Sequence, residues 1–132
     1  MNLEIEYTQL VGKQSFHTGI DLAGEWHTNI MSVLDGKVVS AGVQGAYGNC
    51  VKIEHQYKDE TIYSLYAHLA EIKVYEGQEV KQGNVIGTQG GDPVRDNNPG
   101  TSTGSHLHFE IRKSARGDFQ NPRNYLYGGD SS

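Results

Sequence analysis

Residues 104–111 alternate between polar and apolar side chains, which is the pattern of a half-buried β-strand. Because successive side chains of a strand point to opposite faces, the apolar members are predicted to face a core: Leu107, Phe109 and Ile111. The polar members are predicted to share the other face: His106, His108 and Glu110. Two imidazoles on one face of a sheet can reach the same metal ion or reacting bond, although a solvated face with two histidines has the same pattern.

Size and composition restrict the class of protein. A chain of 132 residues is long enough for one domain with a buried core, and its 17 glycines favour strands joined by turns. We predict a single all-β domain over residues 1–127, with few or no helices, and a flexible tail over residues 128–132. The net charge of −5 argues against nucleic-acid binding, and no apolar run is long enough for membrane insertion.

The single cysteine, Cys50, excludes an intramolecular disulfide, so the fold depends on packing or on a metal. It lies at the predicted start of a strand, where we expect a buried small hydrophobic residue rather than a nucleophile or a ligand. The acidic first residues, Met-Asn-Leu-Glu-Ile-Glu, do not have the architecture of a signal peptide. We therefore expect a cytosolic chain, a part of a larger protein, or a protein delivered by a route that the sequence does not reveal.

Two further predicted strands carry histidines. Residues 16–22 place His17 and Asp21 on one surface. Residues 61–69 are rich in aromatic and apolar side chains, which places His68 in or near the body of a sheet. Taken alone, the first pair fits a surface histidine near a turn-capping carboxylate, and His68 fits a structural histidine with satisfied hydrogen bonds.

Turn signals divide the rest of the chain. The Asp35-Gly36 pair between apolar runs is a hairpin signal. His55 ends an alternating segment near a charged hairpin tip at residues 58–60, so we predict that its side chain is solvated. Residues 88–105 form a long irregular segment that leads into the His-x-His strand, and they are expected to wall one side of a site there.

Together the separate β segments supply these polar residues: His17, Asp21, His68, His106 and His108. A catalytic zinc ion has three protein ligands and an open position for water, and imidazole and carboxylate groups suit it. Four histidines and one aspartate provide three ligands with two histidines to spare. Zinc lowers the pKa of its water to about 7, and a spare imidazole exchanges protons at neutral pH. The set predicts zinc-dependent hydrolysis without the His-Glu-x-x-His motif of helical metalloproteases.

The histidines lie within longer motifs that follow one another along the chain: His-Thr-Gly-Ile-Asp (17–21), Asp-Gly-Lys-Val (35–38), Tyr-Gly-Asn (47–49), Tyr-Ala-His-Leu (66–69), Gly-Gln-Glu-Val-Lys-Gln-Gly (77–83), Ser-Thr-Gly-Ser-His-Leu-His-Phe-Glu (102–110) and Asn-Pro (121–122). In these motifs, from about residue 16 to 126, the chain resembles the LytM/lysostaphin-type peptidoglycan endopeptidases, the M23 metallopeptidases. The resemblance implies a mainly antiparallel all-β fold, related to the barrel-sandwich hybrid, with zinc at the floor of a groove across the sheet.

The resemblance also implies a role for each residue of the set. His17, Asp21 and His108 would ligate one zinc ion per chain. His68 and His106 would be the catalytic pair that orients and deprotonates the water and stabilises the tetrahedral intermediate. The substrates would be peptide stems or cross-bridges of bacterial peptidoglycan. Some family members that have lost ligands activate other hydrolases, but this chain retains every position, so we expect activity.

Other residues near the motifs are candidates for supporting roles. The segment of residues 89–101 is longer than the usual glycine turn of the family. The resemblance therefore fixes neither the shape of the groove nor the peptide bond that is cut. Tyr7 and Tyr47 are candidates for the aromatic helper that family members place near the site. Glu110 points the same way as His108 by alternation and is a candidate hydrogen-bond partner for a ligand or catalytic imidazole.

Two other classes of protein remain as alternatives. A catalytically inactive member of the same fold, acting as a binding or regulatory module, would bind no zinc or show no turnover. A biotinyl or lipoyl carrier domain is suggested by the valine and glycine rhythm of residues 74–83, but the expected carrier lysine is missing and the histidines stay unexplained. Because a wall hydrolase must reach the wall, we expect an extracellular or cell-wall location, as a domain of a larger protein or in a phage virion.

Overall fold

The computed structural model of the chain describes residues 20–23, 25–92, 94, 106–113 and 119–120, and of residues 20–23, 106, 119 and 120 it describes the backbone alone. Several predictions fall outside these ranges: those for Tyr7, His17, most of the segment 88–105 and the tail 128–132. None of the helices in the described part of the chain has the length and apolar character needed to cross a membrane.

The described chain consists of short β-strands and one 3-10 helix, which confirms the all-β prediction. The elements are β1 (Ile20–Ala23), β2 (Asn29–Met31), β3 (Gly36–Val43), η1 (Gly45–Tyr47), β4 (Asn49–Tyr57), β5 (Glu60–Ala67), β6 (Leu69–Ile72), β7 (Glu79–Val80), β8 (Val85–Gln89), β9 (His106–Arg112) and β10 (Phe119–Gln120).

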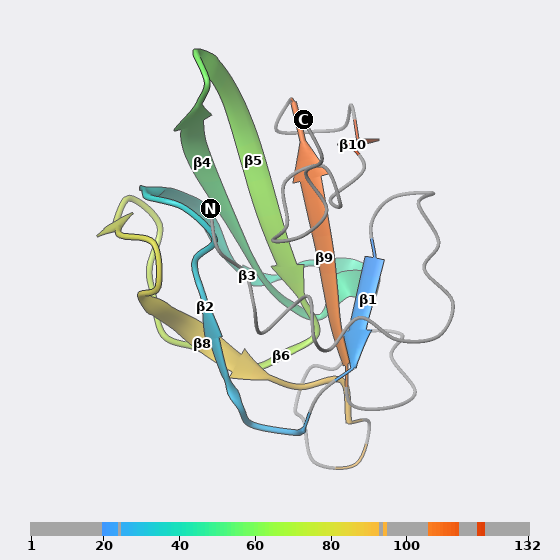
Figure 1. The fold of residues 1–132 in the computed structure, drawn as a ribbon. Coiled ribbons are helices and arrows are strands. Elements are labelled where there is room, and N and C mark those ends of the chain that lie inside the picture. Colours follow the sequence, from blue (N-terminus) through green and yellow to red (C-terminus); the bar gives the residue numbers. More distant parts are fainter. Residues whose placement is uncertain (1–19, 24, 93, 95–105, 114–118, 121–132) are drawn as a thin grey trace.

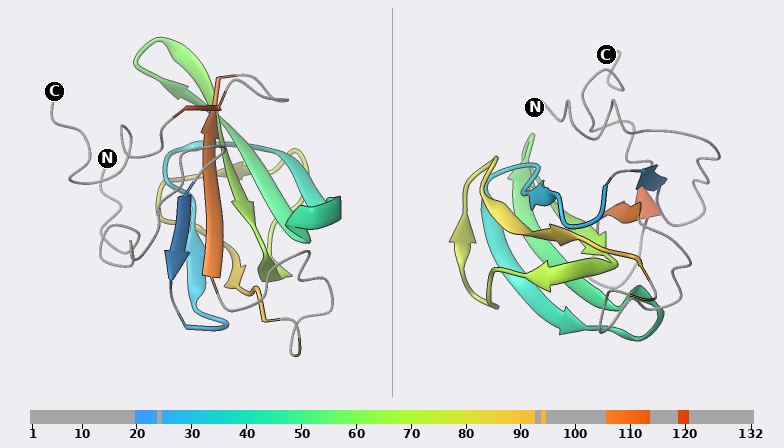
Figure 2. Two further views of the ribbon diagram at one scale, coloured as in Figure 1. Left: turned by 90° about the vertical axis from the view of Figure 1, so that its right-hand side faces the viewer. Right: turned by 90° about the horizontal axis from the view of Figure 1, so that it is seen from below.

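The strands form two antiparallel sheets. The larger sheet has the order β1-β9-β5-β4-β3-β7, with β10 also paired to β9, and the smaller sheet has the order β2-β8-β6. Figure 1 shows β9 between β5 and β1, with the smaller sheet toward the lower ends of these strands. The same three strands stay side by side when the molecule is turned (Figure 2). Strand β9 therefore has a hydrogen-bonded neighbour on each side.

Apolar side chains from both sheets form the main core. On β9, the predicted core residues are buried: Leu107, Phe109 and Ile111 are 2%, 0% and 0% exposed. The Phe109 ring packs against the ring of Tyr66 on β5, with centroids 5.3 Å apart. Burying each such side chain stabilises the fold by about 1.5–3 kcal/mol. The core therefore fixes which face of β9 turns inward.

His55 is buried, so the prediction that it is solvated is wrong. Its side chain is 1% exposed and belongs to a chain of buried polar groups. Nδ1 lies 2.8 Å from the carbonyl oxygen of Asp35, and Nε2 lies 2.7 Å from the hydroxyl of Ser64. The hydroxyls of Ser64 and Tyr66 share a hydrogen bond of 2.9 Å, and the Val33 N–H donates to Tyr66 at 3.0 Å. Because a carbonyl only accepts, Nδ1 of His55 carries a proton.

The Asp35-Gly36 pair does not form the predicted hairpin. Strand β2, which precedes it, pairs with β8 in the small sheet, whereas β3, which follows it, pairs with β4 and β7 in the large sheet. Glycine is needed at position 36 because a Cβ there would lie 2.3 Å from the Glu54 carbonyl oxygen and 2.6 Å from His55 Nδ1. The pair therefore marks a change of sheet and a close approach of two strands.

We expect Gly36→Ala to lower the free energy of unfolding by about 1–3 kcal/mol, because backbone atoms of β4 must move to admit the methyl group. Gly42→Ala, on the same strand, is the matched control, since a Cβ there meets nothing within 4 Å. Urea unfolding of both variants measures the difference. Equal stability of the two variants would contradict the close approach at residue 36.

Burial lowers the pKa of His55, although its hydrogen bond to the Asp35 carbonyl and the charges of Asp35 and Glu54 act in the opposite direction. The unfolded chain takes up this proton near pH 6.5, the ordinary histidine value, and the folded chain only at lower pH. The free energy of unfolding should therefore fall as the pH drops below about 6.5. His55→Gln, which does not titrate, should lose this part of the pH dependence. A stability difference between the two proteins that does not change with pH would contradict the assignment.

Candidate functional site

Of the predicted site residues that the structure describes, His68, His108 and the backbone of Asp21 and His106 lie at one end of the large sheet. There β5 ends at Ala67 and β9 begins at His106. Ala67 pairs with His108 on one side, and on the other side Asp21 of β1 pairs with His108. Directly opposed residues in antiparallel strands have Cα atoms about 4.5–5.5 Å apart. The backbone register thus brings Asp21 next to His108 although they are distant in the sequence.

His68 stands at the corner where the chain leaves one sheet for the other. The sequence predicts one strand over residues 61–69, but β5 ends at Ala67 and β6 of the small sheet begins at Leu69. His68 between them has a φ of 63°, the left-handed region that non-glycine residues rarely adopt. Residues held in such conformations cluster at functional sites. The local conformation therefore marks His68 as more than an ordinary strand residue.

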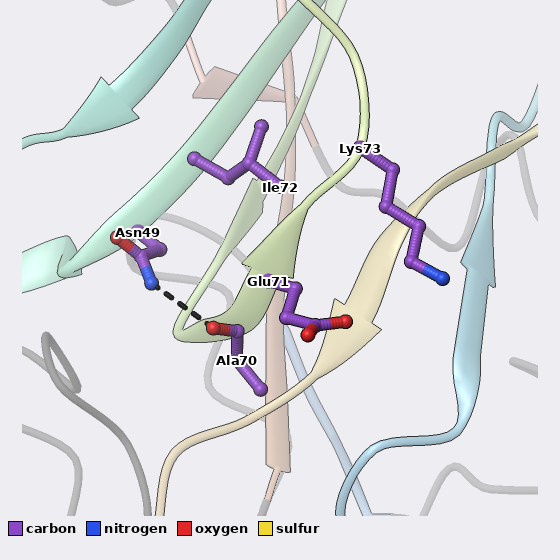
Figure 3. Close-up of a pocket in the computed structure, with 5 residues that line it drawn as sticks. All are labelled: Asn49, Ala70, Glu71, Ile72 and Lys73. Atoms are coloured by element: carbon purple, nitrogen blue, oxygen red, sulfur yellow. Dashed lines mark hydrogen bonds between the residues drawn. The ribbon is translucent and has the colours of Figure 1, made fainter.

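The Tyr47–Asn49 segment holds this corner. The backbone N–H of His68 donates to the carbonyl oxygen of Tyr47 at 2.9 Å. The side-chain amide of Asn49 donates to the carbonyl oxygens of Leu69 at 3.0 Å and Ala70 at 3.3 Å, the latter drawn in Figure 3. These bonds hold the backbone at His68 and at the two residues that follow it.

The imidazoles of His68 and His108 lie near each other and are largely buried. Their ring centroids are 6.3 Å apart with an interplanar angle of 62°. The His68 residue is 6% exposed and the His108 side chain 16%. The Tyr47 ring stacks on His108, with centroids 5.8 Å apart and an interplanar angle of 18°. Tyr47 therefore contacts both histidines, which supports the idea that it lies at the site.

Glu110 is fully buried beside His108, which confirms the predicted hydrogen bond to a site imidazole. Its Oε2 lies 2.8 Å from His108 Nε2 and accepts a 2.6 Å hydrogen bond from the Tyr47 hydroxyl. Its Oε1 accepts a 2.8 Å bond from Arg112 Nε, and a second guanidinium nitrogen lies 2.6 Å away. Arg112 is not among the residues predicted from the sequence, although its position continues the alternation of His108 and Glu110 by two more residues.

Burial and charge act in opposite directions on this cluster. Burial alone would raise the pKa of Glu110, but hydrogen bonds from His108, Tyr47 and Arg112 and the guanidinium charge together lower it. Burial and the neighbouring Glu110 raise the pKa of Tyr47 to about 12. At neutral pH Glu110 is therefore an anion and the Tyr47 hydroxyl keeps its proton to donate.

Of the three predicted zinc ligands, only His108 has a described side chain. Among the described residues no group of three or more His, Cys, Asp or Glu side chains could hold a metal ion. His17 lies outside the described residues, and only the backbone is described for Asp21 and His106. What is described is an imidazole, His108, hydrogen-bonded to a carboxylate, which is the usual surrounding of a zinc-binding histidine.

Cys50 and a surface pocket lie outside this cluster. Burial raises the pKa of the Cys50 thiol to about 12, so the thiol is protonated and the predicted role of a buried hydrophobic residue is confirmed. A pocket of about 430 Å³ beside β6 is lined by Asn49, Ala70, Glu71, Ile72 and Lys73 (Figure 3). Its lining includes no histidine, so it is not the candidate site.

The chain is similar to known peptidases in sequence and in fold. Residues 15–122 match the model of peptidase family M23. The chain is 43% identical over 96 residues to a DD-carboxypeptidase/endopeptidase, Mpg, of Neisseria meningitidis, covering 73% of this chain and 20% of that protein. It is 41% identical over 109 residues to the murein hydrolase activator NlpD of Escherichia coli, covering 82% of this chain and 25% of that protein. The chain thus spans about a fifth to a quarter of these relatives.

Solved structures share the fold. The catalytic domain of the antimicrobial peptidase lysostaphin from Staphylococcus simulans superposes with a TM-score of 0.71 at 28% identity, covering 83% of this chain and 77% of that chain. A zinc-containing peptidase from Vibrio cholerae superposes with a TM-score of 0.61 at 36% identity, covering 72% of this chain and 26% of that chain. The two-sheet architecture is therefore that of lysostaphin-type peptidases.

The left-handed backbone of His68 makes a testable contribution to stability. We expect His68→Gly to be more stable than His68→Ala by roughly 1 kcal/mol, because only glycine adopts a φ of 63° without a steric penalty. Both variants lose the same imidazole, so a comparison by thermal unfolding isolates the backbone term. A glycine variant that is less stable than the alanine variant would contradict a strained conformation at this corner.

Proposed function

Because the chain belongs to peptidase family M23, we propose that it is a zinc-dependent endopeptidase that hydrolyses peptide bonds of bacterial cell-wall peptidoglycan. The observation that carries the proposal is the convergence of His68 and His108 at one end of the sheet, 6.3 Å apart, with Asp21 opposite His108 in the strand register. Largely buried imidazoles beside a buried carboxylate are the groups that metal-assisted hydrolysis needs.

The proposed zinc ligands are His17, Asp21 and His108, two imidazoles and one carboxylate, a donor set that zinc accepts. When bound, zinc lowers the pKa of water to about 7 and polarises a carbonyl group. His108 supplies an imidazole whose orientation is fixed by Glu110. The backbone of Asp21 is next to that of His108, which supports their joint role.

The proposed proton carriers are His68 and His106. Histidine accepts and returns a proton near neutral pH, which peptide hydrolysis requires when water attacks and the amine departs. The backbone of His68 is held by its bond to the carbonyl oxygen of Tyr47, and the residue is 6% exposed. His106 precedes His108 by two residues on β9, which is next to β1 and β5.

The proposed substrate is a peptidoglycan peptide, supported by a relative named as a carboxypeptidase and endopeptidase and by the likeness to lysostaphin. With a net charge of −5, the chain has no general attraction to an anionic wall, so adhesion is assigned to other parts of a larger assembly. The place of action is the cell wall, reached as a domain of a larger protein or as part of a phage virion.

A second function is favoured by one comparison. A relative at 41% identity is named a murein hydrolase activator, so a regulatory module that binds without cutting is the alternative. This chain has a histidine or aspartate at each proposed site position, which favours catalysis.

The test measures zinc content and the loss of turbidity of a purified peptidoglycan suspension. We expect one zinc ion per chain and clearing that a chelator abolishes and added zinc restores. Mass spectrometry of the released fragments then identifies the bond that is cut. Zinc binding without clearing on walls of several cross-bridge types would favour the regulatory module, and absence of zinc would contradict the proposal.

Two variants separate the proposed roles. His108→Ala is expected to lose both zinc and clearing, because it removes a ligand. His106→Ala is expected to retain zinc and lose clearing, because it removes a proton carrier. Equal loss of zinc in the two variants would overturn this division of roles.

A further inference from the structure

We propose that Glu110, held by Tyr47 and Arg112, is a positioning residue that fixes the orientation and the tautomer of the His108 imidazole. The inference rests on the proposed function, because it concerns His108 as a metal ligand. It assigns Tyr47, Glu110 and Arg112 a role that is exerted through His108, without direct contact to metal or substrate.

Both oxygens of the Glu110 carboxylate have hydrogen-bond partners. Oε1 faces two guanidinium nitrogens of Arg112, at 2.8 and 2.6 Å, and Oε2 faces the Tyr47 hydroxyl at 2.6 Å and His108 Nε2 at 2.8 Å. The residue is 0% exposed, so water does not compete for these positions. Rotation of the carboxylate would break several of these bonds at once. Its position is therefore fixed, and with it the position of His108 Nε2.

An ionised carboxylate only accepts hydrogen bonds, so the bond to Glu110 requires a proton on Nε2 of His108. In a neutral imidazole the lone pair then belongs to Nδ1. A metal ion binds the nitrogen that carries the lone pair. Glu110 would thus leave Nδ1 as the atom of His108 that is available to a metal ion.

Tyr47 restrains the same imidazole from a second direction. Its ring stacks on that of His108 with an interplanar angle of 18°, while its hydroxyl donates to Glu110. Its carbonyl oxygen accepts the backbone N–H of His68 at 2.9 Å. One residue of η1 therefore restrains a proposed ligand and a proposed proton carrier together.

Arg112 makes a buried anion tolerable at this position. Its side chain is 7% exposed and its guanidinium balances the charge of Glu110. A buried carboxylate without such a partner would be costly to keep ionised. The neutral amide of glutamine has the shape of glutamate, but it presents an N–H₂ group where one of the two accepting oxygens stood. Glu110→Gln therefore changes the hydrogen-bond pattern of the side chain and keeps its shape.

The test compares Glu110→Gln and Tyr47→Phe with matched controls, Glu54→Gln and Tyr63→Phe. Glu54 accepts a hydrogen bond from Tyr63 at 3.2 Å, a pair of the same residue types that involves neither His108 nor Glu110. Zinc dissociation constants are measured by competition with a chelator. The tautomer of His108 is measured in metal-free protein from the NMR shifts of its ring nitrogens.

We expect Glu110→Gln to weaken zinc binding about 10- to 100-fold, the usual effect of losing a partner behind a metal ligand. Tyr47→Phe should weaken it about 2- to 10-fold, the effect of losing one hydrogen bond. Both variants should shift His108 away from the Nε2–H form that we expect in the parent protein, and the two controls should change neither quantity.

Unchanged zinc affinity and an unchanged His108 tautomer in Glu110→Gln would overturn the inference. If that variant does not fold, Tyr47→Phe decides by the same two measurements, because it keeps the ring and the backbone carbonyl. If the parent protein binds no zinc, the proposed function is wrong, and the tautomer comparison in metal-free protein still decides whether Glu110 positions His108.

Discussion

The face of β9 that carries His108 depends on one interaction, the buried ion pair of Glu110 and Arg112. Both side chains are almost fully removed from water, at 0% and 7% exposure. Removing one partner of such a pair costs about 3–5 kcal/mol, because the other charge stays buried. Tyr47 and His108 both bond to the same carboxylate. The order of these side chains therefore follows from the requirement that a buried charge be satisfied.

The position of that carboxylate is itself set by the core. Leu107, Phe109 and Ile111 occupy the inner face of β9, and β5 and β1 pair with its two edges. A register slip of one residue would exchange the faces and bury the polar residues among apolar ones. Packing on one face of β9 thus holds His108 and Glu110 on the other face. The proposed chemistry uses a geometry that the apolar core maintains.

Local sequence signals failed at two passages between the sheets and at one buried histidine. Residues 61–69 have a continuous β pattern, yet His68 interrupts it with a left-handed backbone. Asp35-Gly36 has the composition of a hairpin, yet the strands on its two sides belong to different sheets. His55 lies beside charged residues in the sequence, yet its ring is buried between Asp35 and Ser64. Each of these outcomes depends on partners that a short window of sequence does not contain.

The sequence by itself determined the all-β class, the burial of Cys50 and the two faces of β9. It also placed Glu110 on the same side of the strand as His108, because alternation along one strand is a local property. The roles of His17, Asp21 and His106 stay predictions. Only the tertiary structure decided that Tyr47 and Arg112 meet at Glu110 and that Asn49 holds the corner after His68. Tyr47 and Glu110 are 63 residues apart in the chain. Such contacts exist only after the strands have paired, because strand order is set by the packing of the whole core.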